Sequence, residues 1–254
     1  MRLLFTLLVF TGLASAQASP FHWKGSVAQG RAIEVRGING DVFAEGYDGA
    51  DVEIVANVAD ESGVMTPVKV QVVESDKGVT VCTTYVGPDP DRQGKCVGDI
   101  ATESEKKGAR VNFTVRVPKG VGLIGRTVNG AVQAENLDAD VEAYTVNGKI
   151  RISTTGSAQA RTINGSIFAS LSNPFWRQRR EFSTVNGSIT LNLPAQFSTR
   201  VRAETINGRV STAFRLRNPA RQDDHVVEGA IGCGGGAGLK LKTVNGSIQL
   251  NKVT

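Results

Sequence analysis

A six-residue motif, T-[VI]-N-G-x-[IV], recurs along the chain and constrains its fold more than any other feature. Its copies begin at residues 37, 127, 145, 162, 184, 205 and 243, the first with glycine in place of threonine. The motif asparagines are Asn39, Asn129, Asn147, Asn164, Asn186, Asn207 and Asn245, spaced by 90, 18, 17, 22, 21 and 38 residues. Such a period is typical of stacked supersecondary units. We therefore interpret the 90-residue step as containing an insertion and the 38-residue step as about two turns.

Apolar and small residues alternate with polar ones on both sides of the motif, which is typical of half-buried β-strands. Around the third copy they occupy odd positions before it (Val141, Ala143) and even positions after it (Ile150, Ile152). A strand alternates with period two, so this change requires a corner or a bulge, and Asn-Gly tolerates the positive φ expected there.

A two-residue hairpin turn is one interpretation of each Asn-Gly pair. However, the next apolar segment follows only after another turn signal, such as residues 154–156, and threonine recurs together with Asn-Gly. Parallel stacking of equivalent corners accounts for both observations, because the asparagines can then pair along a ladder and the threonines gain partners.

We therefore expect an all-β fold, a single-stranded β-solenoid of stacked coils of about 17–22 residues with a β-hairpin-containing insertion near the N-terminus. Residues 28–254 would form one solenoid domain, with an insertion at 59–110 and regular repeats at 111–254. Alternating segments at 68–72, 79–81 and 111–117 predict strands that cap or extend the sheet. Residues 87–108 are rich in Gly, Asp and Lys and predict a long exposed loop.

Residues 1–16 combine an early positive charge at Arg2, a short apolar run and small residues at 14–16, the pattern of a cleavable secretory signal. Residues 17–27 are expected to be a flexible N-terminal segment. The mature chain would carry a mild net charge of +4 once Arg2 is removed from the formal +5. We expect an exported protein, in the periplasm, at the cell surface or extracellular, with no transmembrane segment in the mature form and no nucleic-acid partner.

These repeats, the segment V-R-V-P-K-G at 115–120 and the closing stretch at 232–250 resemble the putative-adhesin family of bacterial β-strand-repeat envelope proteins. The resemblance extends over about residues 28–254 and is weakest in the insertion. It implies export, a β-solenoid and a surface or envelope role, and it supplies no catalytic motif.

The chain has three cysteines. Cys82 and Cys96 are 14 residues apart and flank the expected loop, so in an exported protein we predict a disulfide between them. Cys233 is left over, either as a buried thiol or for an intermolecular cross-link.

No catalytic residue, cofactor or metal site is predicted, because His22 and His225 are the only histidines and no paired acids accompany the repeats. The stretch 223–225 is interpreted as a solvated loop. The outward residues just before each motif form a stripe of mixed charge, interpreted as a solvated face or a weak binding surface: Arg36, Arg126, Tyr144, Arg161, Ser183, Glu204 and Lys242.

An aromatic pair beside three arginines interrupts the repeats and is the best candidate for a ligand-binding site: Phe175, Trp176, Arg177, Arg179 and Arg180. Exposed, these residues could stack on sugars and bind anionic glycopolymer groups. In the other interpretation the two aromatic rings cover the flank of the solenoid and only the arginines are solvated.

The sequence thus favours a non-enzymatic, exported β-repeat protein with an envelope-associated or adhesin-like interaction or structural role. Its expected partner is an envelope polysaccharide or another envelope protein. The alternative is a carbohydrate-active enzyme of β-helix type, a polysaccharide lyase or hydrolase, which would need a concave site with convergent acid, base or metal groups.

Overall fold

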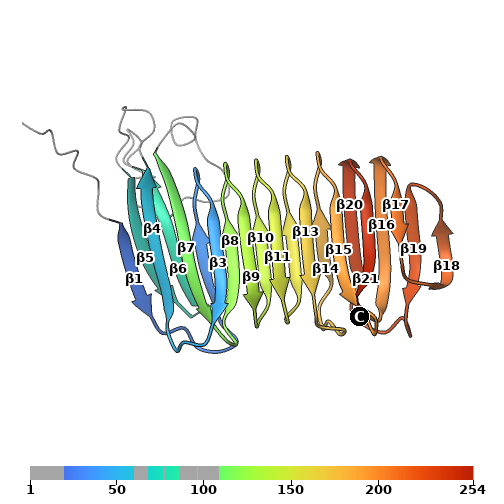
Figure 1. Cartoon of the computed structure of the whole chain (residues 1–254), viewed down its shortest axis with the longest axis horizontal. Coiled ribbons are helices and arrows are strands. Elements are labelled where there is room, and N and C mark those ends of the chain that lie inside the picture. The colour runs from blue at the N-terminus through green and yellow to red at the C-terminus, as the bar shows by residue number, and fades with distance from the viewer. Residues whose placement is uncertain (1–19, 60–67, 77, 86–95, 97–108, 254) are drawn as a thin grey trace, which may run out of the picture.

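The computed structural model describes residues 20–59, 68–76, 78–85, 96 and 109–253. The expected signal peptide and nearly all of the loop at 87–108 lie outside these residues. The described chain is all-β and forms a long row of strands in two layers (Figure 1). The part of the chain that the structure describes contains no helix that is long and apolar enough to cross a membrane.

The strands belong to two mixed sheets, here called sheet A and sheet B. Sheet A has ten strands in the order β1 (Phe21–Gly25), β4 (Val52–Ala59), β7 (Arg110–Pro118), β3 (Val42–Tyr47), β9 (Val132–Leu137), β11 (Ile150–Thr154), β13 (Ile167–Leu171), β15 (Ile189–Pro194), β21 (Ile248–Val253) and β17 (Val210–Thr212). Sheet B has eleven strands in the order β18 (Leu216–Gln222), β19 (Val226–Ile231), β16 (Thr199–Asn207), β20 (Leu239–Asn245), β14 (Arg180–Ser183), β12 (Ala158–Arg161), β10 (Val141–Tyr144), β8 (Gly122–Arg126), β2 (Ala32–Arg36), β6 (Gly78–Tyr85) and β5 (Val68–Ser75).

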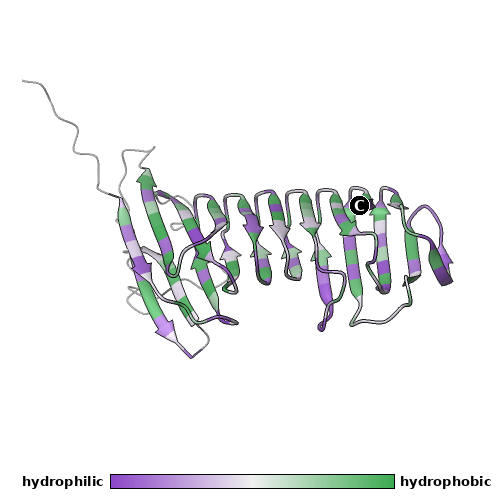
Figure 2. Ribbon diagram, turned by 60° about the horizontal axis from the view of Figure 1, so that its bottom comes forward, coloured by the Kyte–Doolittle hydropathy of each residue, from purple (hydrophilic) through white to green (hydrophobic). Residues whose placement is uncertain are grey.

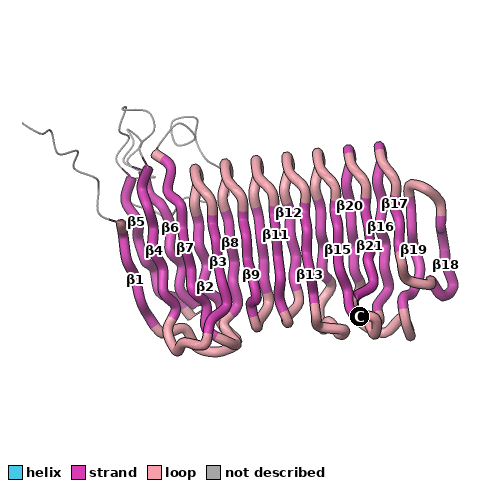
Figure 3. The backbone as a smooth tube through the Cα atoms, in the orientation of Figure 1, coloured by secondary structure: helices cyan, strands magenta, loops and turns pink. Residues whose placement is uncertain are grey.

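Each copy of the motif joins a strand of sheet B to a strand of sheet A, and the corners line up along one edge of the molecule (Figure 3). We call such a pair of strands with its corner a rung. Val141 and Ala143 of β10 and Ile150 and Ile152 of β11 are buried in one core between the sheets, which confirms the change of inward parity across the corner. The same alternation is visible as bands of hydropathy along the strands (Figure 2).

The asparagines of the seven corners form the expected ladder. Asn39 stands at the N-terminal end of the ladder, and each of the other six donates from Nδ2 to the Oδ1 of the asparagine on the next rung toward that end, over 2.7 to 2.9 Å. The amide dipoles therefore all point the same way, an arrangement in which neighbouring hydrogen bonds polarise one another.

The threonine and the glycine of the motif both lie against the same carbonyl oxygen of the neighbouring rung. Thr145 donates from Oγ1 to the carbonyl oxygen of Gly130 over 2.8 Å, and a Cβ placed on Gly148 would lie 1.8 Å from that oxygen. The five other corners that carry threonine repeat both contacts. Our sequence interpretation assigned the glycine to a positive φ, but among the seven only Gly40 and Gly246 have one. The close approach of stacked backbones is the reason that no side chain fits at this position.

The order of the rungs departs from the order of the sequence at both ends of the row. The 38-residue step that we interpreted as about two turns contains the antiparallel strands β18 and β19, after which the chain turns back. The last rung, β20 and β21, then lies between the rung of β14 and β15 and the rung of β16 and β17. At the other end, the rung of β2 and β3 lies between β6 and β7 on one side and β8 and β9 on the other.

The N-terminal end of the row is built partly from residues expected to be flexible. Within the segment 17–27, Phe21 to Gly25 form β1, which pairs antiparallel with β4. Phe21 and Trp23 are partly buried against the core, and this burial explains why these residues form a strand. The predicted strands at 68–72, 79–81 and 111–117 are present as β5, β6 and β7, and β5 and β6 form an antiparallel pair.

Replacing Asn164 by alanine should lower the free energy of unfolding by about 1 to 3 kcal/mol, because two ladder hydrogen bonds are lost. The matched control is Arg161→Ala on the same rung, an exposed residue with one ion pair at 3.7 Å, which should change stability by about 0.5 kcal/mol or less. Thermal and denaturant unfolding would measure both variants. Equal melting temperatures would contradict a stabilising role for the ladder.

Candidate functional site

The residues predicted as a ligand-binding loop do not form one surface. Trp176 is buried, with its ring edge-on to Phe197 at a centroid distance of 4.9 Å, whereas its neighbour Phe175 is 67% exposed. Arg180 is also buried and donates to Asp140 Oδ2 over 2.6 Å. Only Arg177 and Arg179 remain as exposed cations. Of the two interpretations of this loop, Trp176 follows the second, because its ring fills the flank of the core, whereas Phe175 does not cover the flank.

The residues that directly precede each motif form the predicted stripe of mixed charge on the outer face of sheet B, where neighbouring side chains largely compensate their charges. Arg126 contacts Glu34 over 3.0 Å and lies over the Tyr144 ring, 4.2 Å from its centroid. Burial and nearby Glu142 raise the pKa of Tyr144 to about 12. The tyrosine therefore stays neutral and serves as a hydrogen-bonding and stacking group.

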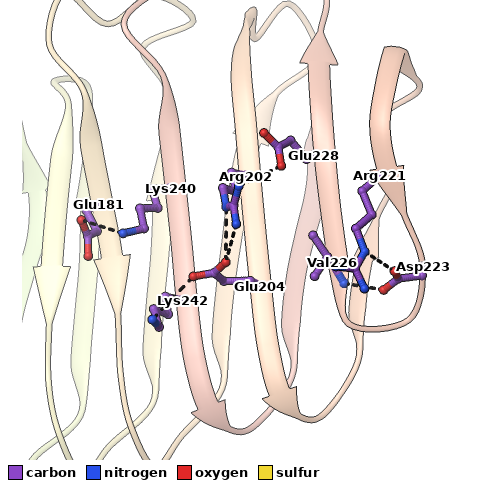
Figure 4. A network of polar contacts seen from close by, with 9 residues as sticks. All are labelled: Glu181, Arg202, Glu204, Arg221, Asp223, Val226, Glu228, Lys240 and Lys242. Atoms are coloured by element: carbon purple, nitrogen blue, oxygen red, sulfur yellow. Dashed lines mark hydrogen bonds and ion pairs between the residues drawn. The ribbon is translucent and has the colours of Figure 1, made fainter.

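Toward the C-terminal end of sheet B the ion pairs run across successive strands (Figure 4). Glu204 contacts Lys242 over 3.6 Å and Arg202 over 3.1 Å, and Arg202 also reaches Glu228 over 3.0 Å. Burial alone would raise the pKa of Glu204, but the hydrogen bond and charge of Arg202 outweigh it and the pKa is lowered. Arg202 is thus committed to carboxylates of its own sheet.

The adjacent row of outward residues is different, because its cations have no acidic partner among the described residues. Arg217 of β18 is paired with Ala230 of β19, and Ala230 is paired with Arg200 of β16. Leu239 is in register with Val201 of β16 and with Arg180 of β14. The residues that precede them, Gly238, Arg200 and Arg179, are therefore aligned as well, and the row continues beyond β16 through Gly238 to Arg179. Arginine and a small residue therefore alternate across five neighbouring strands.

This row lines a groove of about 600 Å³, here called the basic groove. It is lined by the exposed residues Arg179, Arg200 and Arg217 and by small residues including Gly229, Ala230, Ala237 and Gly238. The one carboxylate that lines it, Glu228, is already bound by Arg202. Exposed guanidinium groups that are separated by small residues can donate paired hydrogen bonds to carboxylate, sulfate or phosphate.

The charge of the chain is concentrated at this end. Residues 172–254 hold twelve Lys and Arg against five Asp and Glu, a formal charge of +7, whereas residues 1–171 sum to −2. An uneven distribution of this kind raises the local concentration of anions near the positive end.

Sequence reasoning found Arg179 but missed Arg200 and Arg217. The available signal was the pattern Arg-x-Arg at 200–202 and at 215–217, in which an apolar residue separates two outward arginines. What the pattern could not supply was the register of β16, β19 and β20, because β20 comes from the displaced last rung.

The other predicted groups do not form a site. The disulfide between Cys82 and Cys96 is present, with a Cα–Cα distance of 5.5 Å, and Cys233 is free and exposed, which excludes the buried thiol of the two alternatives for this residue. His22 and His225 are exposed. Within the described ranges no group of three His, Cys, Asp or Glu side chains could hold a metal ion.

The sequence matches no protein-family model and no curated protein sequence. Two solved structures are similar to it at low identity. One is a putative cell adhesion protein from Clostridium sporogenes, with 9% identity and a TM-score of 0.47, over 92% of this chain and 100% of that one. The other is a putative adhesin from Bacteroides fragilis, with 14% identity and a TM-score of 0.37, over 92% of this chain and 97% of that one. Neither similarity is close enough to assign a function.

Truncating Trp176 to alanine should lower the free energy of unfolding by about 3 to 5 kcal/mol, the usual cost of removing a large buried aromatic side chain. The adjacent Phe175→Ala is the matched control and should be nearly neutral, since Phe175 is exposed. Chemical denaturation of the two variants would measure the difference. A stable Trp176→Ala protein would place the indole outside the core.

The turn between β18 and β19, beside the basic groove, should loosen in acid. The backbone N–H of His225, together with Arg221 and the N–H of Val226, lowers the pKa of Asp223 to about 2. Because this pKa is below the ordinary 3.8, the stabilisation is fully present above about pH 4 and is lost as the pH falls through 2. A carboxyl-carbon NMR titration should place the midpoint near 2, and Asp223→Asn should remove the transition. A midpoint near 4 would mean that the turn is not formed in solution.

Proposed function

We propose that this protein is a non-enzymatic, exported β-solenoid that binds an acidic polysaccharide of a cell surface or envelope through the basic groove. The proposal is carried by the row of Arg179, Arg200 and Arg217. These three cations are exposed, have no acidic partner among the described residues, and line the groove together with glycine and alanine.

The stacking of the rungs supports the solenoid part of the proposal. Among the seven rungs the pairing is parallel from strand to strand in both sheets, and the asparagine ladder runs across all seven motif corners. A stack of this kind presents long, flat outer faces, which suit an extended polymer better than a small molecule.

Export is supported by two independent features. The first residues have the pattern of a secretory signal, and Cys82 is bonded to Cys96. Disulfides form and persist in oxidising compartments. The acidic polymers of cell surfaces would therefore be accessible to the groove.

A binding role is favoured over the alternative of a hydrolase because the carboxylate that lines the groove is already engaged. Glycosidic bond cleavage commonly uses two carboxyl groups with different protonation states. Glu228 is engaged by Arg202 over 3.0 Å, an arrangement that suits a structural ion pair. Arginine-dominated surfaces favour charge-assisted recognition of anions.

Binding to chondroitin sulfate and to neutral dextran tests the proposal. The native protein should bind chondroitin sulfate with an affinity that falls as salt is added, and it should not bind dextran. Replacing Arg179, Arg200 and Arg217 together by glutamine should weaken binding by about tenfold to a hundredfold, since three exposed contacts contribute about 0.5 to 1 kcal/mol each.

The matched control replaces Arg31, Arg151 and Arg161 by glutamine, which removes the same net charge from exposed positions outside the groove. This variant should retain most of the affinity. Equal loss in the two triple variants would mean that net charge alone drives the association, and the absence of binding to the acidic polymer would overturn the proposal.

A further inference from the structure

A second hollow lies next to the basic groove, around the free edge of β18. It has a volume of about 830 Å³ and is lined by Arg215 and Lys252 together with the apolar residues Phe197, Phe214 and Leu216. No acidic side chain lines it, and within the described chain neither cation has an ion-pair partner.

The two hollows adjoin each other at Arg217 and Asn218, which line both of them. At this point β18 leaves its regular pairing with β19: the register shifts between Arg217 and Arg221, and Asn218 has a φ of 46°. Pro219 follows and has no N–H to donate, so this part of β18 is blocked as an edge for another strand. The edge is open to a ligand that binds through side chains.

The spacing of the cations indicates what kind of polymer fits. In the basic groove the three arginines lie on every second strand, so the Cα atoms of neighbouring arginines are about 9 to 10 Å apart. The phosphates of one DNA strand recur about every 3.4 Å along the duplex axis, so most of them would find no arginine. A chain with one acidic group on every second sugar has a lower charge density and matches better.

From these observations we infer that the ligand is a linear acidic polysaccharide that runs across the strands of sheet B and continues around β18 into the second hollow. This inference rests on the proposed function of the basic groove. It adds that Arg215 and Lys252 form a second subsite, which only a chain long enough to pass Arg217 can reach. Linking two subsites in one ligand raises affinity beyond that of either alone.

A length series of hyaluronan oligosaccharides, which carry one carboxylate per disaccharide, tests the inference by calorimetry. The Kd should fall with length, then fall by a further tenfold or more once the chain reaches both hollows, and then level off. Arg215→Gln combined with Lys252→Gln should abolish this second gain and leave the affinity for the shorter oligosaccharides unchanged. The matched control, Arg31→Gln with Lys149→Gln, removes the same charge from exposed positions elsewhere and should retain the gain.

The outcomes separate the two proposals. A smooth rise in affinity with length, or equal effects of the two double variants, would overturn the second subsite while the basic groove still binds short chains. Failure of every oligosaccharide to bind the native protein would overturn the basic groove itself. Tighter binding of a single-stranded oligodeoxynucleotide than of long hyaluronan at equal salt would overturn the assignment to a polysaccharide.

Discussion

The structure depends on the contact between the corner glycine of one rung and the carbonyl oxygen of the corner glycine on the next. That oxygen accepts the hydroxyl of a motif threonine, as Gly130 does from Thr145, and it also occupies the space that a Cβ of Gly148 would need. One close approach thus requires both residue types. It also sets the separation at which the asparagine amides meet, so the recurring threonine, asparagine and glycine of the motif are parts of a single packing arrangement.

The regular part of the fold could be predicted from the sequence because its information is local. The parity change between Ala143 and Ile150 and the period of the motif were sufficient for strands, corners and parallel stacking. The ends could not be predicted in the same way. Nothing near β20 in the sequence indicates that it lies between β14 and β16, because that position depends on backbone pairing with strands distant in the chain. The candidate site depends on the same pairing, and therefore only Arg179 was found from the sequence.

At the C-terminal end of sheet B, the charged residues of two neighbouring outer rows have different roles. In one row Arg202 contacts Glu204 and Glu228, so the charges stabilise the surface and leave little net field. In the next row Arg200 faces small residues and has no such partner within the described chain. A shift of the pairing with β19 by two residues would place Arg200 opposite Glu228, where Arg202 now lies, so the pairing that builds the sheet also decides which arginines are available to a ligand.

The position of the last rung has a mechanical consequence. The C-terminus lies within the row of strands and not at its end (Figure 1). A pulling force applied at Thr254 would therefore act first on β21, which is held by β15 on one side and β17 on the other, and not on a terminal strand that could peel away alone. During synthesis the same arrangement delays completion of the stack, because β21 is made after β17 and joins β15 to β17 only once it has been made.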